Sequence, residues 1–153
     1  MQSALSRNRP EIDLLLNCAR TRPDSETDER ILGLVQNGVD WTFLFYSAFR
    51  HGVLPLLHQT LNKVCPRAVP DGTKEQLRKF SLENGRRNLY LAAELLKVLD
   101  ILEGHGIFAV PFKGPVLAES VYGDLSLRGF VDLDILVHKR DAINARNCLL
   151  SRV

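Results

Sequence analysis

The stretch that decides the fold runs from residue 110 to residue 137 and reads VPFKGPVLAESVYGDLSLRGFVDLDILV. A short apolar run ends at Lys113, and a helical pattern begins at Gly114 and Pro115. A second apolar run follows and carries two aspartates, Asp132 and Asp134, one residue apart. Aspartate is a poor strand former, and two like charges on one face repel each other. The second run therefore needs a physical explanation.

The C-terminal third of the chain alternates between strand and helix patterns. The run IFAVPF (107–112) predicts a buried strand, and PVLAESVY (115–122) predicts a short helix. FVDLDILV (130–137) predicts a second strand, and RDAINARNCLLSRV (140–153) predicts another helix. Because two strands joined through a helix favour parallel or mixed pairing, we expect a β-α-β-α order with a parallel or mixed sheet.

The earlier part of the chain reads as helices. The longest is expected from Lys74 to Glu103, where leucines recur at spacings of three, four or seven, and Gly85 in its middle predicts a weak point or a kink. We therefore expect an α+β protein with a helical region, 1–103, and a short β-α-β-α core, 104–153, or one continuous domain made of both.

Two helix starts carry a recognisable signal. Asp40 precedes the aromatic run WTFLFYSAFR, and Asp24 or Ser25 precedes an earlier apolar pattern. The oxygen of such a side chain can accept a hydrogen bond from a free backbone N–H in the first turn of a helix. We therefore predict that Asp40 caps one helix and that Asp24 or Ser25 caps another.

Composition excludes several classes of protein. The chain has 153 residues, is 45% hydrophobic and carries 20 basic against 18 acidic residues, so nothing in it indicates a nucleic-acid surface. No stretch of about 18 apolar residues predicts a membrane span, and no signal peptide is evident at the N-terminus. Cys18, Cys65 and Cys148 form no metal-binding spacing. We interpret them as buried free thiols of a cytoplasmic protein.

The paired aspartates are the first candidate site. In a strand, Asp132, Asp134 and Leu136 would share one face, with the two aspartate Cα atoms about 6–7 Å apart. That spacing lets both carboxylates converge on a divalent cation such as Mg²⁺, which prefers oxygen ligands. The alternative is a half-exposed strand whose aspartates face water, and the strand alone does not decide between the two.

The segment before the first helix is the second candidate site. Gly114 and Pro115 open a helix directly after a strand, and a helix start presents backbone N–H groups that suit a phosphate. Gly114 would allow a close approach, and Lys113 could add a positive charge. The alternative is an ordinary strand-to-helix turn. Arg128 either neutralises the aspartates, contacts a phosphate or lies on the surface.

Together these features resemble the DNA polymerase β-type nucleotidyltransferases. In finer detail, PFKGPVLAESVYGDLSLR and VDLDILV resemble an uncharacterised bacterial nucleotidyltransferase family with a K-G-x-x-L-A helix, a Y-G-D turn, an arginine and D-L-D-x-L-V. The segment DWTFLFYSAFRHGVLPLLHQTL is similar to a helical segment of the same family, so the resemblance spans about residues 30–150. The matching residues are Lys113, Gly114, Leu117, Ala118, Tyr122, Arg128, Asp132, Leu133, Asp134, Leu136 and Val137.

The resemblance implies that residues 104–153 are a truncated nucleotidyltransferase-like core. It also implies transfer of a nucleoside monophosphate from a nucleoside triphosphate to an unknown hydroxyl acceptor. Asp132 and Asp134 would be catalytic and would hold Mg²⁺ or Mn²⁺. The nucleotide would be bound by Lys113, Gly114, Pro115 and Arg128.

One departure from the superfamily pattern bears on activity. The superfamily has a third carboxylate on a later strand, whereas this sequence reaches Val153 without one. A two-stranded sheet would also leave edges and an apolar face uncovered. We therefore expect a fragment, a chain that self-associates or needs a partner chain to complete its sheet, or a non-catalytic remnant that acts as a regulatory binding module.

Overall fold

The computed structural model describes residues 9–151 of the chain. The chain divides into two compact units, Met1–Glu83 and Asn84–Val153, and the boundary falls inside one long helix. Helices dominate both units, and the described residues contain one two-stranded sheet, which confirms the α+β class. Within residues 9–151, no helix is both long enough and apolar enough to cross a membrane.

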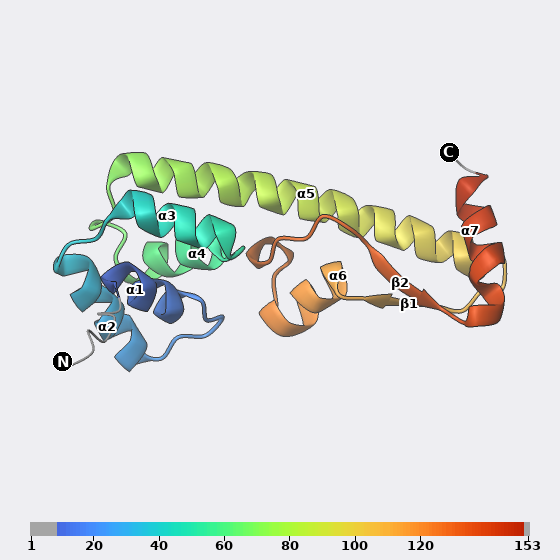
Figure 1. Cartoon of the computed structure of the whole chain (residues 1–153), viewed down its shortest axis with the longest axis horizontal. Helices are drawn as coiled ribbons and strands as arrows, with labels where there is room; N and C mark the ends of the chain where they lie inside the picture. Colours follow the sequence, from blue (N-terminus) through green and yellow to red (C-terminus); the bar gives the residue numbers. More distant parts are fainter. Residues whose placement is uncertain (1–8, 152–153) are drawn as a thin grey trace, which may run out of the picture. The chain divides into compact units, whose positions relative to one another are not determined.

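The first unit consists of helices (Figure 1), and two of them begin at predicted side-chain caps. The Asp24 side chain accepts a hydrogen bond from the Thr27 backbone N–H at 2.8 Å, and the Asp40 side chain accepts one from Phe43 N–H at 3.0 Å. Both predicted caps are therefore confirmed, with Asp24 rather than Ser25 in the first. The helices are α1 (Pro10–Cys18), α2 (Ser25–Gln36), α3 (Trp41–Arg50), α4 (Leu54–Val64) and the beginning of α5 (Asp71–Gly104).

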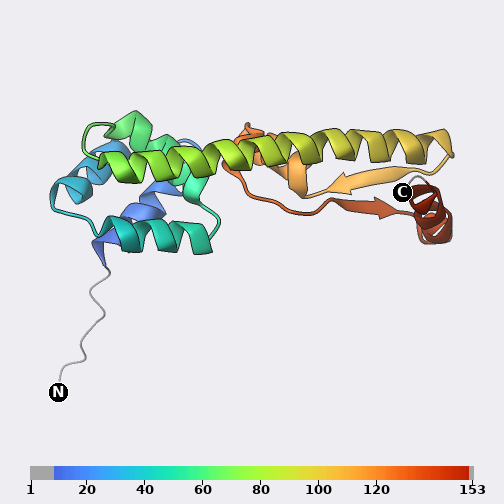
Figure 2. The same ribbon diagram turned by 90° about the horizontal axis from the view of Figure 1, so that it is seen from above.

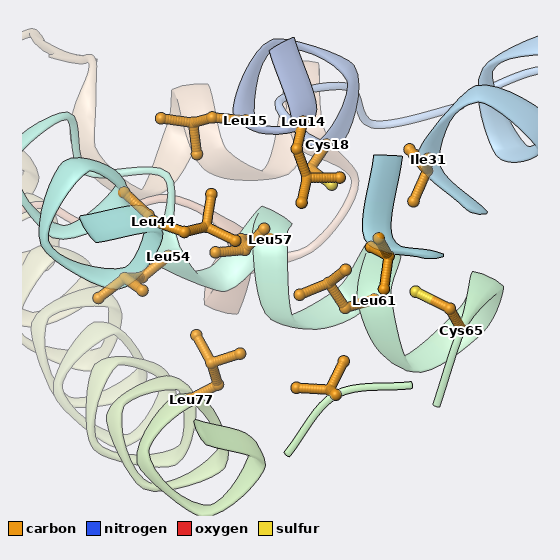
Figure 3. Close-up of a cluster of buried hydrophobic side chains, with 13 residues drawn as sticks. Leu14, Leu15, Cys18, Ile31, Leu44, Leu54, Leu57, Leu61, Cys65 and Leu77 are labelled. Carbon is orange, nitrogen blue, oxygen red and sulfur yellow. The ribbon is translucent and has the colours of Figure 1, made fainter. Parts of the chain in front are cut away.

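Leucines from these helices make the core of the first unit. Figure 3 shows their side chains converging from α1, α3, α4 and the start of α5. Each fully buried leucine contributes about 1.5–3 kcal/mol through the apolar area removed from water. The labelled members of this core are Leu14, Leu15, Cys18, Ile31, Leu44, Leu54, Leu57, Leu61, Cys65 and Leu77.

A buried carboxylate ties two helices of this unit together. Glu11, on α1, is buried, and its Oε1 accepts a hydrogen bond from the backbone N–H of Asp40 at 2.9 Å. Asp40 therefore uses its own N–H to hold α1 and its side chain to cap α3. A buried polar group needs such a partner, because leaving it unpaired would cost stability.

The second unit contains the rest of α5, the sheet and several short helices. Helix α5 continues without a break through Gly85, where a Cβ atom would lie 3.4 Å from the Ser126 Cβ. The glycine thus marks a close approach of another segment and not a break in the helix. The other elements are β1 (Ala109–Phe112), α6 (Gly114–Leu117), η1 (Ala118–Tyr122), η2 (Leu125–Leu127), β2 (Asp134–Val137), η3 (Lys139–Asp141) and α7 (Ala142–Leu150).

The sheet is antiparallel, so the prediction of a parallel or mixed sheet is wrong. Strands β1 and β2 lie side by side in both ribbon views, with Ala109 opposite Val137 and Phe112 opposite Asp134 (Figures 1 and 2). A parallel partner would need the connection to carry the chain back to the beginning of β1. Instead, α6, η1 and the following loop return the chain beside the end of β1, where only antiparallel pairing is available.

Both strands are shorter than predicted, and Asp132 lies outside β2. The strand β2 begins at Asp134, while Asp132 sits in a bend two residues earlier. The reason is that β1 ends at Phe112, because the chain turns into α6 at Gly114. The residues before Asp134 therefore face no strand with which to form a ladder.

The two faces of the sheet differ in their surroundings. On the inner face, Ala109, Ile135 and Val137 pack on a small core that Leu102 of α5, Ile107 and Ala145 of α7 form. The outward-facing apolar side chains Val110, Phe112 and Leu136 are exposed. The predicted uncovered apolar face is therefore present in this part of the chain.

The cap on α3 gives a first test. We expect Asp40→Ala to destabilise the first unit by about 1 kcal/mol, because the first turn of α3 loses the acceptor for Phe43 N–H. Urea denaturation followed by the fluorescence of Trp41, the one tryptophan of the sequence and the first residue of α3, measures this. Glu29→Ala, which removes an exposed acid from α2, is the control and should change stability by less than about 0.5 kcal/mol. Equal effects of the two substitutions would contradict the capping role.

The buried thiols give a second test. Burial, with a smaller contribution from Cys65, raises the pKa of the Cys18 thiol to about 12, and burial also raises the pKa of Cys65. A thiol with a raised folded-state pKa stabilises the fold fully below its unfolded pKa, and that contribution is lost as the pH rises toward the folded value. We expect unit 1 to lose stability above about pH 9.

In the same protein, an alkylating reagent at pH 8 should modify the partly exposed Cys148 in the native state. It should modify Cys18 and Cys65 only after denaturant is added, since only the thiolate of an accessible cysteine reacts. Peptide mapping by mass spectrometry distinguishes the three sites. Native-state modification of Cys18 as fast as that of Cys148 would refute the burial argument.

Candidate functional site

The antiparallel register brings the two predicted parts of the site together. Phe112, the last residue of β1, pairs with Asp134, the first residue of β2. Just beyond this pair, a Cβ atom on Gly114 would lie 3.6 Å from the carbonyl oxygen of Asp132. The start of α6 and the aspartate segment are therefore neighbours, although they are far apart in sequence.

The backbone between β1 and α6 adopts an unusual conformation. Lys113 has φ 62° and ψ −146°, and it is the one non-glycine residue with positive φ within residues 9–151. Gly114 follows with φ 47°. Such a conformation costs a non-glycine residue about 1–3 kcal/mol and is concentrated at functional sites. The segment therefore differs from an ordinary strand-to-helix turn.

The side chains of this turn have contrasting environments. Gly114 and Pro115 are buried at the start of α6, and no side chain caps that start. Lys113 is exposed, and its Nζ lies 5.1 Å from the centre of the Phe112 ring. The turn thus combines a rigid backbone with a positive charge that can move in solvent.

Asp132 and Asp134 are both exposed, while Leu133 and Ile135 between and after them are partly buried. This alternation places the two carboxylates on the solvent side of the segment, as the strand pattern predicted. Among residues 9–151, no group of three or more His, Cys, Asp or Glu side chains is arranged to hold a metal ion. Two carboxylates nevertheless suit Mg²⁺, which commonly takes one or two of them together with substrate phosphates.

Arg128 is not paired with the aspartates. The described part of the chain contains no ion pair between Arg128 and Asp132 or Asp134, and the Arg128 Nη1 atom is buried without a hydrogen-bond partner there. An unpaired buried donor is unfavourable, and more so when it is charged.

Two buried asparagines of α5 hold the loop that carries Arg128, and the sequence analysis gave a role to neither of them. Asn88 is fully buried, and its Nδ2 donates hydrogen bonds to the carbonyl oxygens of Leu125 at 2.6 Å and Arg128 at 2.7 Å. Asn84, one turn earlier and also buried, donates from Nδ2 to the Ser126 carbonyl at 2.8 Å. The loop is therefore fixed to α5 through its backbone.

The sequence contains a signal for Asn84 and Asn88. Asn84 lies at helical spacing after Leu77 and Phe80, and Asn88 follows it by four residues, so both continue the apolar stripe of the long helix. Asparagine is a weak helix former that rarely lies inside such a stripe. Two of them in one stripe indicate a polar contact with another segment, although the sequence does not reveal which one.

The helical unit contains a groove that includes none of the predicted site residues. Its volume is about 510 Å³, and it is lined by Thr42, Phe45, Tyr46, Gln76, Lys79, Phe80 and Glu83. The residues that carry chemistry in the sequence argument all belong to the other unit. We therefore place the candidate site at the turn around Gly114 and Asp132.

Comparison with known proteins gives one match. The model of a family described as an uncharacterised nucleotidyltransferase matches residues 37–152, which cover most of the chain and all the residues of the candidate site. No curated protein and no solved structure matches the chain.

The strained turn gives a third test. We expect Lys113→Gly to stabilise the second unit by about 1 kcal/mol, because glycine adopts this conformation without the steric cost that lysine bears. Hydrogen exchange of the β1 and β2 amides measures the change locally. Lys139→Gly is the control, since Lys139 is also exposed but has no positive φ. This variant should be less stable than the unaltered protein by about 0.5–1 kcal/mol. A loss of stability in both variants would show that the turn is unstrained.

Proposed function

Because this chain belongs to the uncharacterised nucleotidyltransferase family, we propose that it transfers a nucleoside monophosphate from a nucleoside triphosphate to a hydroxyl acceptor. The observation that carries the proposal is the closeness of Gly114 at the start of α6 to Asp132. This neighbourhood joins a backbone suited to phosphate to carboxylates suited to a divalent cation. The same arrangement supports placing the family among the DNA polymerase β-type nucleotidyltransferases.

In this proposal Asp132 and Asp134 hold Mg²⁺, or Mn²⁺, together with the triphosphate. Both carboxylates are exposed, so a hydrated cation that carries nucleotide can reach them. The bound cation would supply Lewis-acid charge at the phosphates and at the acceptor oxygen. The role of the two side chains is to fix the position of this charge beside the turn at Gly114.

The remaining site residues would bind the polyphosphate. Gly114 has no side chain that would keep phosphate oxygens from the backbone where α6 begins, and Pro115 fixes the direction of the first turn. Lys113 adds a mobile positive charge, and Arg128 offers a donor that has no partner within the described residues. Arginine is well matched to phosphate because its donors lie in a planar fork.

The proposed reaction makes and breaks one bond at the α-phosphorus. The acceptor oxygen bonds to this phosphorus and loses its proton, while the bond to the bridging oxygen breaks and pyrophosphate leaves with that electron pair. The chain contributes by positioning and by charge, since these residues orient the nucleotide and offset negative charge on the leaving group.

A second candidate function is a binding module without turnover. Two observations favour it: the described residues provide no cluster of three metal-binding side chains, and the outer face of the sheet exposes Val110, Phe112 and Leu136. Such a face suits self-association or a partner chain that completes the sheet. If sedimentation velocity shows that the protein is a monomer over a range of concentrations, self-association is excluded.

The leading proposal predicts Mg²⁺-dependent nucleotide binding and transfer. At least one of ATP, GTP, CTP and UTP should raise the melting temperature with Mg²⁺ and lose this effect in EDTA. In an assay with an α-labelled triphosphate and candidate hydroxyl acceptors, Asp132→Asn with Asp134→Asn should lower transfer by about a hundredfold or more, because the charge that holds the cation is gone.

The control is the pair Asp100→Asn and Glu103→Gln, which removes two negative charges from exposed positions of α5. This pair should leave binding and transfer within about twofold of the unaltered protein. Transfer that survives the aspartate substitutions would exclude these residues from catalysis. Nucleotide binding without transfer to any acceptor would favour the binding module.

A further inference from the structure

We propose that Asn88, supported by Asn84, is a positioning residue that holds Arg128 for contact with a nucleotide phosphate. The inference rests on the proposed function, because it names how this chain prepares one group of that site. Its basis is the set of hydrogen bonds between α5 and the segment Leu125–Gly129.

The geometry at Asn88 fixes two points of the loop at once. One Nδ2 group donates to the carbonyls of Leu125 and Arg128, so both of its N–H donors are used. These carbonyls belong to the first residue of the short helix η2 and to the residue that follows η2, and the Asp124 side chain caps η2 by accepting from Ser126 N–H at 2.7 Å. Asn88 therefore sets where the backbone of Arg128 leaves η2.

Neighbouring contacts orient the side chain of Asn84. Arg87 Nη2 donates to Asn84 Oδ1 at 2.9 Å, which directs the Asn84 Nδ2 toward the Ser126 carbonyl. A Cβ atom on Gly129 would lie 3.6 Å from the same Asn84 Oδ1, so the loop also passes close to this amide after Arg128. Hydrogen bonds therefore hold the loop up to Arg128, and the chain passes close to Asn84 directly after it.

Burying the Asn88 amide costs stability, so we infer that its role is to position the loop. A leucine at Asn88 would bury apolar area, whereas a buried amide loses its hydration and needs hydrogen-bond partners in exchange. The Asn88 Nδ2 finds two carbonyl oxygens, while the Asn88 Oδ1 is buried with no partner among the described residues, which adds to the cost. A buried polar network specifies one backbone arrangement more strictly than apolar contacts do. Here the specified residue is Arg128, whose Nη1 is buried with no partner in the described part of the chain.

A phosphate oxygen is the acceptor that we propose for the guanidinium of Arg128, a residue that is only partly buried. The segment that follows Arg128 leads within four residues to Asp132, which lies beside Gly114. A charged hydrogen bond from guanidinium to phosphate is about twice as strong as a neutral one, provided that the donor is already oriented. Asn88 would supply that orientation without touching the nucleotide.

The test is a double-mutant cycle on Mg²⁺-nucleotide binding, with the triphosphate that gives the largest thermal shift. Asn88→Leu should raise the Kd about tenfold in the otherwise unaltered protein, and less than about twofold when Arg128→Ala is already present. Hydrogen exchange should show faster exchange of the amides from Ser126 to Phe130 in Asn88→Leu, with or without nucleotide. Leu95→Ala is the control, because Leu95 is buried on the same helix and its loss lowers stability without releasing the loop.

Several outcomes separate this inference from the proposed function. If the unaltered protein binds none of the four triphosphates with Mg²⁺, the proposed function falls and the inference falls with it. If it binds and Asn88→Leu raises the Kd equally in both backgrounds, or leaves it unchanged, only the positioning role is overturned. If Asn88→Leu does not fold, Asn84→Ala takes its place, with an expected rise of about threefold that Arg128→Ala abolishes.

Discussion

The antiparallel pairing of Phe112 with Asp134 is the constraint on which the candidate site depends. It fixes the end of one strand against the beginning of the other, and it places the start of α6 beside Asp132. A shift of one residue in this pairing would exchange the faces of the sheet. It would turn Asp134 toward the small core around Leu102 and Ala145 and expose Ile135 instead.

A second constraint acts through polar groups buried in a helix. The asparagines of α5 hold a loop by its carbonyl oxygens, and the glycines at 85 and 129 mark where helix and loop come close. Apolar packing would tolerate small shifts of this loop, whereas hydrogen bonds to its carbonyls define its position. Backbone strain at Lys113 and the unpaired Nη1 of Arg128 occur in the same unit as these contacts. The strain at Lys113 and the unpaired Nη1 of Arg128 both lower the local stability of this unit, and a bound ligand could offset that cost.

The predictions from sequence succeeded where they depended on neighbouring residues. The caps at Asp24 and Asp40, the helix after Pro115 and the alternation of exposed and buried residues around Asp134 each involve groups a few positions apart. The prediction of a parallel or mixed sheet failed because strand direction depends on where the connecting segment returns. Asp132 was placed in a strand because an alternating pattern continues past the point where the partner strand stops.

The sequence by itself determined the capped starts of α2 and α3, the α+β order, the spacing of the two aspartates and the turn at Lys113 and Gly114, because side-chain chemistry and local sterics decide these. Only the tertiary structure decided the register of the strands, the closeness of Gly114 to Asp132 and the attachment of the Arg128 loop to α5. The bonds of Asn88 join residues 37 and 40 positions apart. No local pattern shows which of many distant carbonyl groups will meet a buried amide, since that choice follows from the packing of the whole unit.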